Sequence, residues 1–220
     1  MDPCFIITGK LSKESVPDLI ECYKDYPYKI LSTWEQEDFS LLSLLESKGF
    51  KLILNRPEGA PIAANFQSVC IVRACELAKQ MGFTRCIRTR TDMVFHNLGL
   101  FLTLLQPFFE LNDKLICLSG MSKEEPPLLY YVDLLMAGTT EQLLRFFKPM
   151  QAGEDPRCCE VFWLEEYIGR PIQSKADILD AFIFCGQSLQ GKPVLCEWRG
   201  KGWELFQCFV RPTNNFIWYS

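Results

Sequence analysis

The first half of the chain alternates short apolar runs with longer segments in which apolar residues recur at helical spacing. The apolar runs predict strands at residues 4–9, 28–33, 50–55 and 83–89. The segments between them predict helices at residues 14–26, 35–49 and 62–81. Acidic residues open the helix predicted at 35–49, and Gly49 suits its C-terminal end. This alternation indicates βαβ units, and therefore an α/β fold with a mostly parallel, Rossmann-like sheet and helices on both faces.

The second half of the chain is less regular. It predicts a helix from residue 98 that stops near Pro107, a strand at 113–120, and helices at 141–148, 159–169 and 175–184. The tail after residue 193 reads as strands, with turns at 200–202 and 212–215. No internal repeat or linker-like stretch interrupts the sequence. One α/β domain over residues 1–220 is therefore the simplest interpretation.

Composition and charge exclude several classes of protein. With 220 residues, 48% of them apolar, the chain can bury a large core and is not of the disordered class. A net charge of −4 argues against a protein that coats nucleic acid. No stretch approaches the roughly 20 apolar residues that span a bilayer, and the N-terminus does not resemble a signal peptide. The sequence thus predicts a cytoplasmic protein with no transmembrane segment.

The eleven cysteines predict buried free thiols rather than a disulfide framework. Their number is odd, no C-x-x-C spacing occurs, and most of them lie inside apolar runs. A zinc site would need clustered cysteine and histidine, which this spacing does not provide.

The segment TRCIRTRTDMVF places charged residues where the fourth predicted strand ends. In a parallel sheet, ligands bind beyond the carboxyl ends of the strands, so Gly9, residues 33–35 and Asp92 should share one rim. A carboxylate at Asp92 could ligate a divalent cation, and the guanidiniums of Arg88 and Arg90 suit a polyphosphate. An exposed basic loop, with Asp92 capping the next helix, explains the same residues equally well. No P-loop or dinucleotide fingerprint is present, which argues against ATP hydrolysis and NAD chemistry.

His96 is the one histidine of the chain and lies four residues after Asp92. It could be a second metal ligand, although a structural role fits its apolar surroundings better. A catalytic pair of serine or cysteine with histidine has no other histidine to use. The tryptophans, among them Trp163, could stack on a sugar, but their apolar context favours the core.

Several segments together carry a family resemblance. ITGKLS, YKDYPYKILSTWEQED, NFQSVCIVRACELAKQMG, RTRTDM and VDLLMAG occur in the order seen in WavE-type lipopolysaccharide-synthesis proteins. The chain resembles this family and, more widely, the GT-A glycosyltransferases, including small ones of large DNA viruses. The resemblance covers roughly residues 4–170 and is sharpest at 32–35 and 90–92.

The resemblance implies transfer of a sugar from a nucleotide-diphosphate sugar to a glycan acceptor. It also implies a GT-A-like fold, with a nucleotide-binding half at about residues 1–95 and an acceptor and catalytic half at about 96–220. Arg90-Thr91-Asp92 stands in place of the family's metal-binding D-x-D motif, so Asp92 would hold Mn²⁺ or Mg²⁺, although Arg90 replaces the first acid. The residues expected to border the nucleotide sugar are Thr8, Gly9, Thr33, Trp34, Glu35, Asn65, Gln67, Arg88 and Arg90.

Glycosyl transfer with inversion needs a base for the acceptor hydroxyl. Asp133 is the first candidate, because an acid inside so apolar a run is costly without a purpose. An aspartate held by backbone donors at a strand end is the competing explanation. Glu165 is the second candidate, with Glu160 and Glu166 as alternatives.

Two other functions remain open from the sequence. A sugar-phosphate nucleotidyltransferase would have a glycine-rich basic loop after the first strand, where TGKLSKES has one glycine and two lysines. A non-catalytic α/β module that binds a nucleotide sugar, or serves as a structural protein, would explain the missing acid of D-x-D.

Overall fold

The structure is a computed structural model of the chain. It describes residues 2–56, 63–110, 114–118, 121–122, 135–148, 159–184, 196–198, 206–208 and 216–217. Among the described helices, none has the length and apolar character that crossing a membrane requires.

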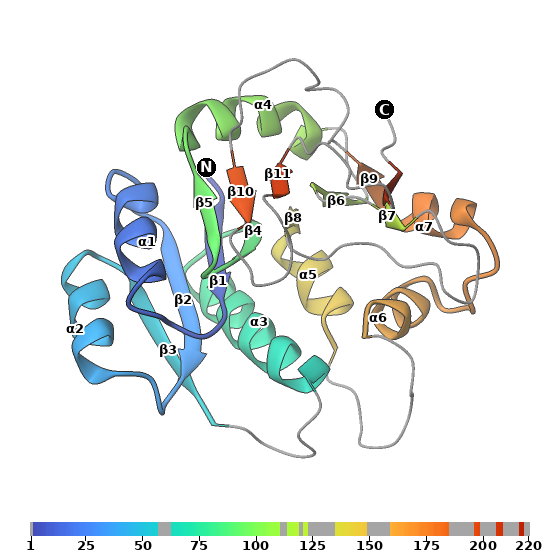
Figure 1. Cartoon of the computed structure of the whole chain (residues 1–220). Coiled ribbons are helices and arrows are strands. Elements are labelled where there is room, and N and C mark those ends of the chain that lie inside the picture. The colour runs from blue at the N-terminus through green and yellow to red at the C-terminus, as the bar shows by residue number, and fades with distance from the viewer. Residues whose placement is uncertain are drawn as a thin grey trace.

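A seven-stranded mixed sheet forms the centre of the protein (Figure 1). Its strands follow the order β3-β2-β1-β4-β8-β6-β9. All neighbours in this order pair in parallel except β8, which runs antiparallel to both β4 and β6. The strand bounds are β1 Cys4–Thr8, β2 Lys29–Trp34, β3 Lys51–Asn55, β4 Arg85–Arg90, β6 Leu115–Cys117, β8 Met136–Thr139 and β9 Phe182–Phe184. The expected α/β fold with a mostly parallel sheet is confirmed.

Smaller ladders lie beside this sheet. β5 (Met93–Phe95) pairs with β10 (Cys196–Trp198), which pairs with β11 (Phe206–Cys208). β7 (Met121–Ser122) pairs with β12 (Phe216–Ile217). Strands in the tail were expected from the sequence, and these short ladders confirm them for the part of the tail that the structure describes.

Helices cover both faces of the central sheet, as the sequence predicts. The helix bounds are α1 Ser15–Tyr23, α2 Phe39–Ser47, α3 Ala63–Gln80, α4 Leu98–Glu110, α5 Thr140–Phe146, α6 Cys159–Ile168 and α7 Lys175–Ala181. One core cluster joins α1, α2 and α4 to the sheet face that carries Phe5, Ile7 and Ile87. A second joins α3, α5, α6 and α7 to the opposite face, through Cys4 and Ile6. Alternate residues of β1 therefore enter different cores, as the two-residue period of a strand requires.

Three predicted boundaries were wrong, each for a local reason. The helix expected from residue 35 begins at Phe39, because the Asp38 side chain accepts a hydrogen bond from the Ser40 amide and caps it there. α4 continues through Pro107 to Glu110, because a proline so near the end removes one hydrogen bond without ending the last turn. The helix expected to reach residue 184 ends at Ala181, and the aromatic and β-branched residues Phe182–Phe184 pair with β6 instead.

Aromatic rings and thiols fill the two cores. Phe5 contacts the rings of Tyr23, Tyr26 and Phe95 in edge-to-face geometry, with centroids 5.1–5.7 Å apart. Trp163 is fully buried, which confirms its assignment to the core. The described free cysteines are all buried or half-buried, as the sequence predicts.

Buried thiols should make the protein less stable in alkaline solution. Burial raises the pKa of Cys86 to about 11 and that of Cys70 to about 12, and it raises the pKa of Cys75 well above its ordinary value. Between pH 9 and 11 the unfolded state releases these protons while the folded state keeps them, so the free energy of unfolding falls as pH rises. We expect a loss of about 1 kcal/mol per buried thiol for each pH unit in this window. Urea denaturation at pH 8, 9 and 10 measures the slope, which Cys75→Ala should make shallower; an unchanged slope in this variant would contradict the explanation.

Candidate functional site

Three parallel strands end side by side at one edge of the sheet. The register pairs Thr8 of β1 with Ser32 of β2 on one side and with Arg90 of β4 on the other. Beyond the strands, the Thr91 amide donates to the Thr8 carbonyl oxygen over 3.0 Å, which keeps β1 and β4 together. The ends of β1, β2 and β4 therefore lie along one rim, which carries Gly9 after β1 and Trp34 at the end of β2.

A small pocket of about 110 Å³ opens at this rim, and we call it the rim pocket. Residues at the ends of β1, β2 and β4 form one wall of the pocket, and the N-terminal half of α3 forms the opposite wall. Its lining residues are Thr8, Gly9, Trp34, Gln67, Cys70, Arg88 and Arg90. The sequence suggests all of them for the site except Cys70, which it predicts only as a core thiol. Pockets that enclose a whole small ligand hold roughly 300–1,000 Å³, so this one can hold only part of a nucleotide sugar.

Arg88 places a positive charge inside the rim pocket. Its side chain is 1% exposed, and its Nη2 donates to the Gln67 carboxamide oxygen over 3.3 Å. The guanidinium carbon lies 5.8 Å from the centre of the Phe147 ring, which is a cation–π contact. This contact helps to fix the orientation of the planar guanidinium. Burial of this residue excludes the exposed-loop interpretation for Arg88. A buried guanidinium that borders a pocket favours an anionic ligand with paired oxygens, such as a phosphate.

The loop after β1 is fastened to its neighbours by three hydrogen-bonding groups. Thr33 Oγ1 lies 2.7 Å from the Gly9 carbonyl oxygen and 3.0 Å from a Glu37 carboxylate oxygen. The Leu11 amide donates to the same Glu37 carboxylate oxygen over 3.1 Å. Thr91 Oγ1 donates to the Lys10 carbonyl oxygen over 2.8 Å. Thr33 is fully buried in this arrangement, so the described geometry makes it a support of the loop rather than a wall of the rim pocket.

Gly9 is required by the backbone at this loop. Its φ of +135° lies in a region that L-residues rarely adopt, and a Cβ at this position would lie 2.5 Å from Thr91 Oγ1. The absence of a side chain therefore allows the first and fourth strands to approach each other at the rim.

Asp92 binds Arg90 with both carboxylate oxygens. Arg90 Nε donates to Oδ1 and Nη2 donates to Oδ2, each over 2.8 Å. The two side chains are about one-third and one-quarter exposed. Asp92 lines a different pocket, of about 160 Å³, on the α1 side of the sheet; its other lining residues are Ser12, Glu14, Ser15, Asp18, Thr91 and Val94. The ion pair thus lies between the rim pocket and this α1-side pocket.

The described residues around Asp92 do not fit a divalent metal site. Within the described part of the chain, no group of three or more histidine, cysteine, aspartate or glutamate residues is placed to hold a metal ion. Both oxygens of Asp92 already accept hydrogen bonds from a cation, whereas Mg²⁺ and Ca²⁺ sites gather several oxygen ligands. His96, the other suggested ligand, lines a separate pocket beside α1. The expected metal role of Asp92 stays a prediction.

The remaining expected site residues are dispersed. Glu35 forms an exposed ion pair with Arg56 over 2.6 Å and lies outside the described lining of the rim pocket. Asn65 lies in the first turn of α3, where its side chain is outside the described residues, and Asp133 lies outside them entirely. Glu165 Oε1 accepts a hydrogen bond from the Ile172 amide over 2.8 Å, which ties α6 to the following segment. The identity of the catalytic base therefore stays a prediction.

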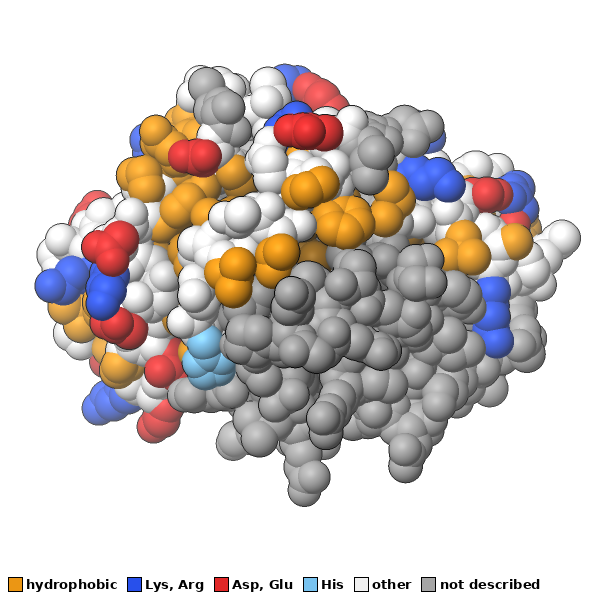
Figure 2. All heavy atoms as spheres, turned by 90° about the horizontal axis from the view of Figure 1, so that it is seen from above, with side chains coloured by type: hydrophobic (Ala, Val, Ile, Leu, Met, Phe, Trp, Pro, Cys, Tyr) orange, Lys and Arg blue, Asp and Glu red, His pale blue; other side chains and the backbone are white. Residues whose placement is uncertain are grey.

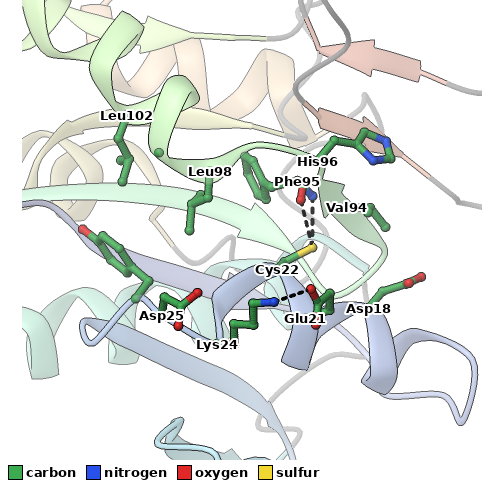
Figure 3. Close-up of a pocket in the computed structure, with 12 residues that line it drawn as sticks. Asp18, Glu21, Cys22, Lys24, Asp25, Val94, Phe95, His96, Leu98 and Leu102 are labelled. Carbon is green, nitrogen blue, oxygen red and sulfur yellow. Dashed lines mark hydrogen bonds and ion pairs between the residues drawn. The ribbon is translucent and has the colours of Figure 1, made fainter.

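A larger pocket of about 600 Å³ lies beside α1 and does not include the rim residues (Figure 3). Asp18, Glu21 and Asp25 of the α1 region line one side of it, and Leu98 and Leu102 of α4 line another. In its wall, the Phe95 amide donates to Cys22 Sγ over 3.1 Å. His96 borders this pocket and is exposed, and Figure 2 shows it at the surface. This pocket shares Asp18 and Val94 with the α1-side pocket, so the two adjoin.

Comparisons with known proteins add likeness of fold only. No protein-family model matches the chain, and no curated protein matches it. Among solved structures, a mannose-1-phosphate geranyltransferase from Thermus thermophilus is 11% identical, with a TM-score of 0.44 over 83% of this chain and 73% of that one. A candidate glucose-1-phosphate thymidylyltransferase from Bacillus anthracis, in complex with a sucrose, is 11% identical, with a TM-score of 0.48 over 84% and 87%. A cytidylyltransferase from Leptospira borgpetersenii serovar Hardjo-bovis is 11% identical, with a TM-score of 0.42 over 65% and 62%.

Proposed function

We propose that the chain is a transferase that acts on a nucleotide-activated sugar and binds its diphosphate at the rim pocket. The observation that carries this proposal is the buried guanidinium of Arg88, which borders a pocket at the carboxyl ends of three parallel strands. Ligands of open α/β sheets bind at this edge. The volume of about 110 Å³ suits the phosphate part of the donor, and the rest would extend along the rim, past Trp34.

Glycosyl transfer is the reaction we propose for this site. The acceptor hydroxyl oxygen forms a bond to the anomeric carbon, the bond from that carbon to the diphosphate oxygen breaks, and the acceptor proton passes to a base. Negative charge grows on the leaving diphosphate, where fixed guanidinium donors stabilise it more strongly than they stabilise the bound donor. Arg88 and Arg90 would supply these donors. Asp133 and Glu165 remain the proposed bases, and a glycan is the proposed acceptor.

Nucleotidyl transfer is the second candidate. Lys10 and Lys13 are both exposed on the loop after β1, where a nucleotidyltransferase would need positive charge for a triphosphate. Two backbone amides of this loop already donate to protein groups. The Leu11 amide donates to the Glu37 carboxylate, and the Ser12 amide donates to Ser15 Oγ. Two of the solved structures of similar fold are named as a cytidylyltransferase and a thymidylyltransferase. The exposed lysines are the feature of this chain that favours the reaction, and a direct assay tests it.

One incubation series separates these functions. The chain is mixed with UDP-, GDP-, CDP- and dTDP-sugars together with a panel of mono- and oligosaccharide acceptors, and the release of nucleoside diphosphate is measured by chromatography. A parallel series contains nucleoside triphosphates with sugar 1-phosphates, and the release of pyrophosphate is measured. Our proposal predicts nucleoside diphosphate in the first series. Pyrophosphate in the second series alone would establish nucleotidyl transfer, and thermal-shift binding of a nucleotide sugar with neither product would favour a non-catalytic module.

A further inference from the structure

We infer that Asp92 is a positioning residue, which holds Arg90 at the rim pocket so that two guanidiniums neutralise the diphosphate without a bridging cation. The inference rests on the proposed function, because it concerns how the same pocket receives its ligand. It assigns to Asp92 a role different from that of the metal-binding acid that the sequence suggested.

The two sides of the ion pair face different pockets. Residues two apart on a strand share a face, so Arg88 and Arg90 point to the same side of β4. Both line the rim pocket. Asp92 comes after the end of the strand and lines the α1-side pocket. A metal ion held by Asp92 alone would therefore lie on the α1 side, whereas the guanidinium it binds borders the proposed phosphate position.

The geometry of the pair is suited to fixing an arginine. Two parallel hydrogen bonds of 2.8 Å define both the distance and the plane of the Arg90 fork. An arginine side chain carries about 2 kcal/mol of rotamer entropy, and less of it is lost on ligand binding when another group has already ordered the fork. A guanidinium has five N–H donors, so one edge can bind a carboxylate while another edge meets a phosphate.

The second guanidinium is already fixed by different contacts. Arg88 is held by Gln67 and lies over the ring of Phe147. Arg88 and Arg90 are thus oriented by separate neighbours and border one small pocket. Two preordered forks match the two phosphate groups of a nucleoside diphosphate in number and in hydrogen-bonding geometry.

Isothermal titration with UDP, GDP, CDP and dTDP tests the inference on the whole chain, in buffer with EDTA and in buffer with MnCl₂. We expect one of them to bind with dissociation constants that agree within about threefold in the two buffers. Asp92→Asn and Arg90→Met should each weaken binding about tenfold in both buffers. The double variant should bind no more weakly than Arg90→Met, because a residue that acts only through Arg90 has no effect once Arg90 is gone. Glu141→Gln, which breaks an exposed ion pair with Lys79, should change binding less than twofold.

The outcomes distinguish this inference from the proposed function. Binding that is lost in EDTA, and whose dependence on MnCl₂ disappears in Asp92→Asn, would overturn the inference while the proposed function stands. Independent, multiplicative losses in the double variant would also overturn it. If none of the four diphosphates binds in either buffer, the proposed function fails and the inference falls with it.

Discussion

Replacement of Arg88 by methionine should weaken the binding of a nucleoside diphosphate about 100-fold. Hydrogen bonds to charged groups each contribute about 1.5–3 kcal/mol when the partner is buried, and 2.7 kcal/mol corresponds to about 100-fold in affinity. Methionine fills much of the same space as the arginine stem. The variant should stay folded, with a free energy of unfolding within about 1 kcal/mol of the parent, because loss of a buried charge also removes its desolvation cost.

A matched control for this variant lies on the same strand. Arg85 is at the opposite end of β4, half-buried, with its guanidinium carbon 5.3 Å from the centre of the Phe109 ring. Arg85→Met should leave nucleotide binding within twofold of the parent. Arg88→Lys should recover only a small part of the lost affinity, because lysine keeps the charge but not the planar fork. Equal binding by Arg88→Met and the parent would remove the main support for a phosphate at the rim.

Replacement of Gly9 by alanine should destabilise the protein by about 3–4 kcal/mol. A residue with a side chain at φ +135° is strained by about 1–3 kcal/mol, and the new Cβ would lie 2.5 Å from Thr91 Oγ1. The chain must shift where β1 and β4 meet, so the rim pocket should deform as well. Urea denaturation measures the stability, and titration of the same variant measures its nucleotide affinity, which should fall at least tenfold.

Two companion variants separate strain from steric overlap. Gly82 also has a positive φ, +87°, but an added Cβ there would have no heavy atom within 4 Å. Gly82→Ala should therefore destabilise the protein by only about 1 kcal/mol, the usual strain of a left-handed residue. Combining Gly9→Ala with Thr91→Ala removes the overlapping oxygen, so the double variant should be more stable than the sum of the two single losses predicts. Strict additivity would show that the overlap has no part in the effect.

Residue pattern was enough to predict most of the central sheet. The short buried runs of β1 and β2 fit only strands, and the long helical period of α3 fits only a helix. Because strands and helices alternate along the chain, these strands are expected to pair in parallel. Short elements were missed where tertiary pairing decides the conformation. β5 has three residues and exists by pairing with β10, which follows it by about 100 positions in the chain. The residues of β9 continue a helical pattern in the sequence, but they form a strand because they pair with the neighbouring strand β6.

The rim pocket was predictable in part. Strand ends and the parallel order place Gly9, Trp34 and Arg90 at one edge, so the residue pattern could name them, and the family resemblance added Thr8. The pairing of Asp92 with Arg90 was not predicted. Such a pairing depends on the directions of the side chains, which cannot be derived from the sequence. The contact of Phe147 with Arg88 was not predicted either, because these residues are 59 positions apart and meet only through packing of the fold. The large pocket beside α1 had no signal in the sequence beyond scattered acids.

A crystal structure of the chain grown with the best-binding nucleoside diphosphate, in the presence of EDTA, tests the central claim most directly. Our account predicts diphosphate oxygens within hydrogen-bonding distance of the Arg88 and Arg90 guanidiniums, with the nucleoside lying along the carboxyl edge of the sheet. A nucleotide bound elsewhere, for example in the large pocket beside α1, with both arginines away from its phosphates, would contradict the account.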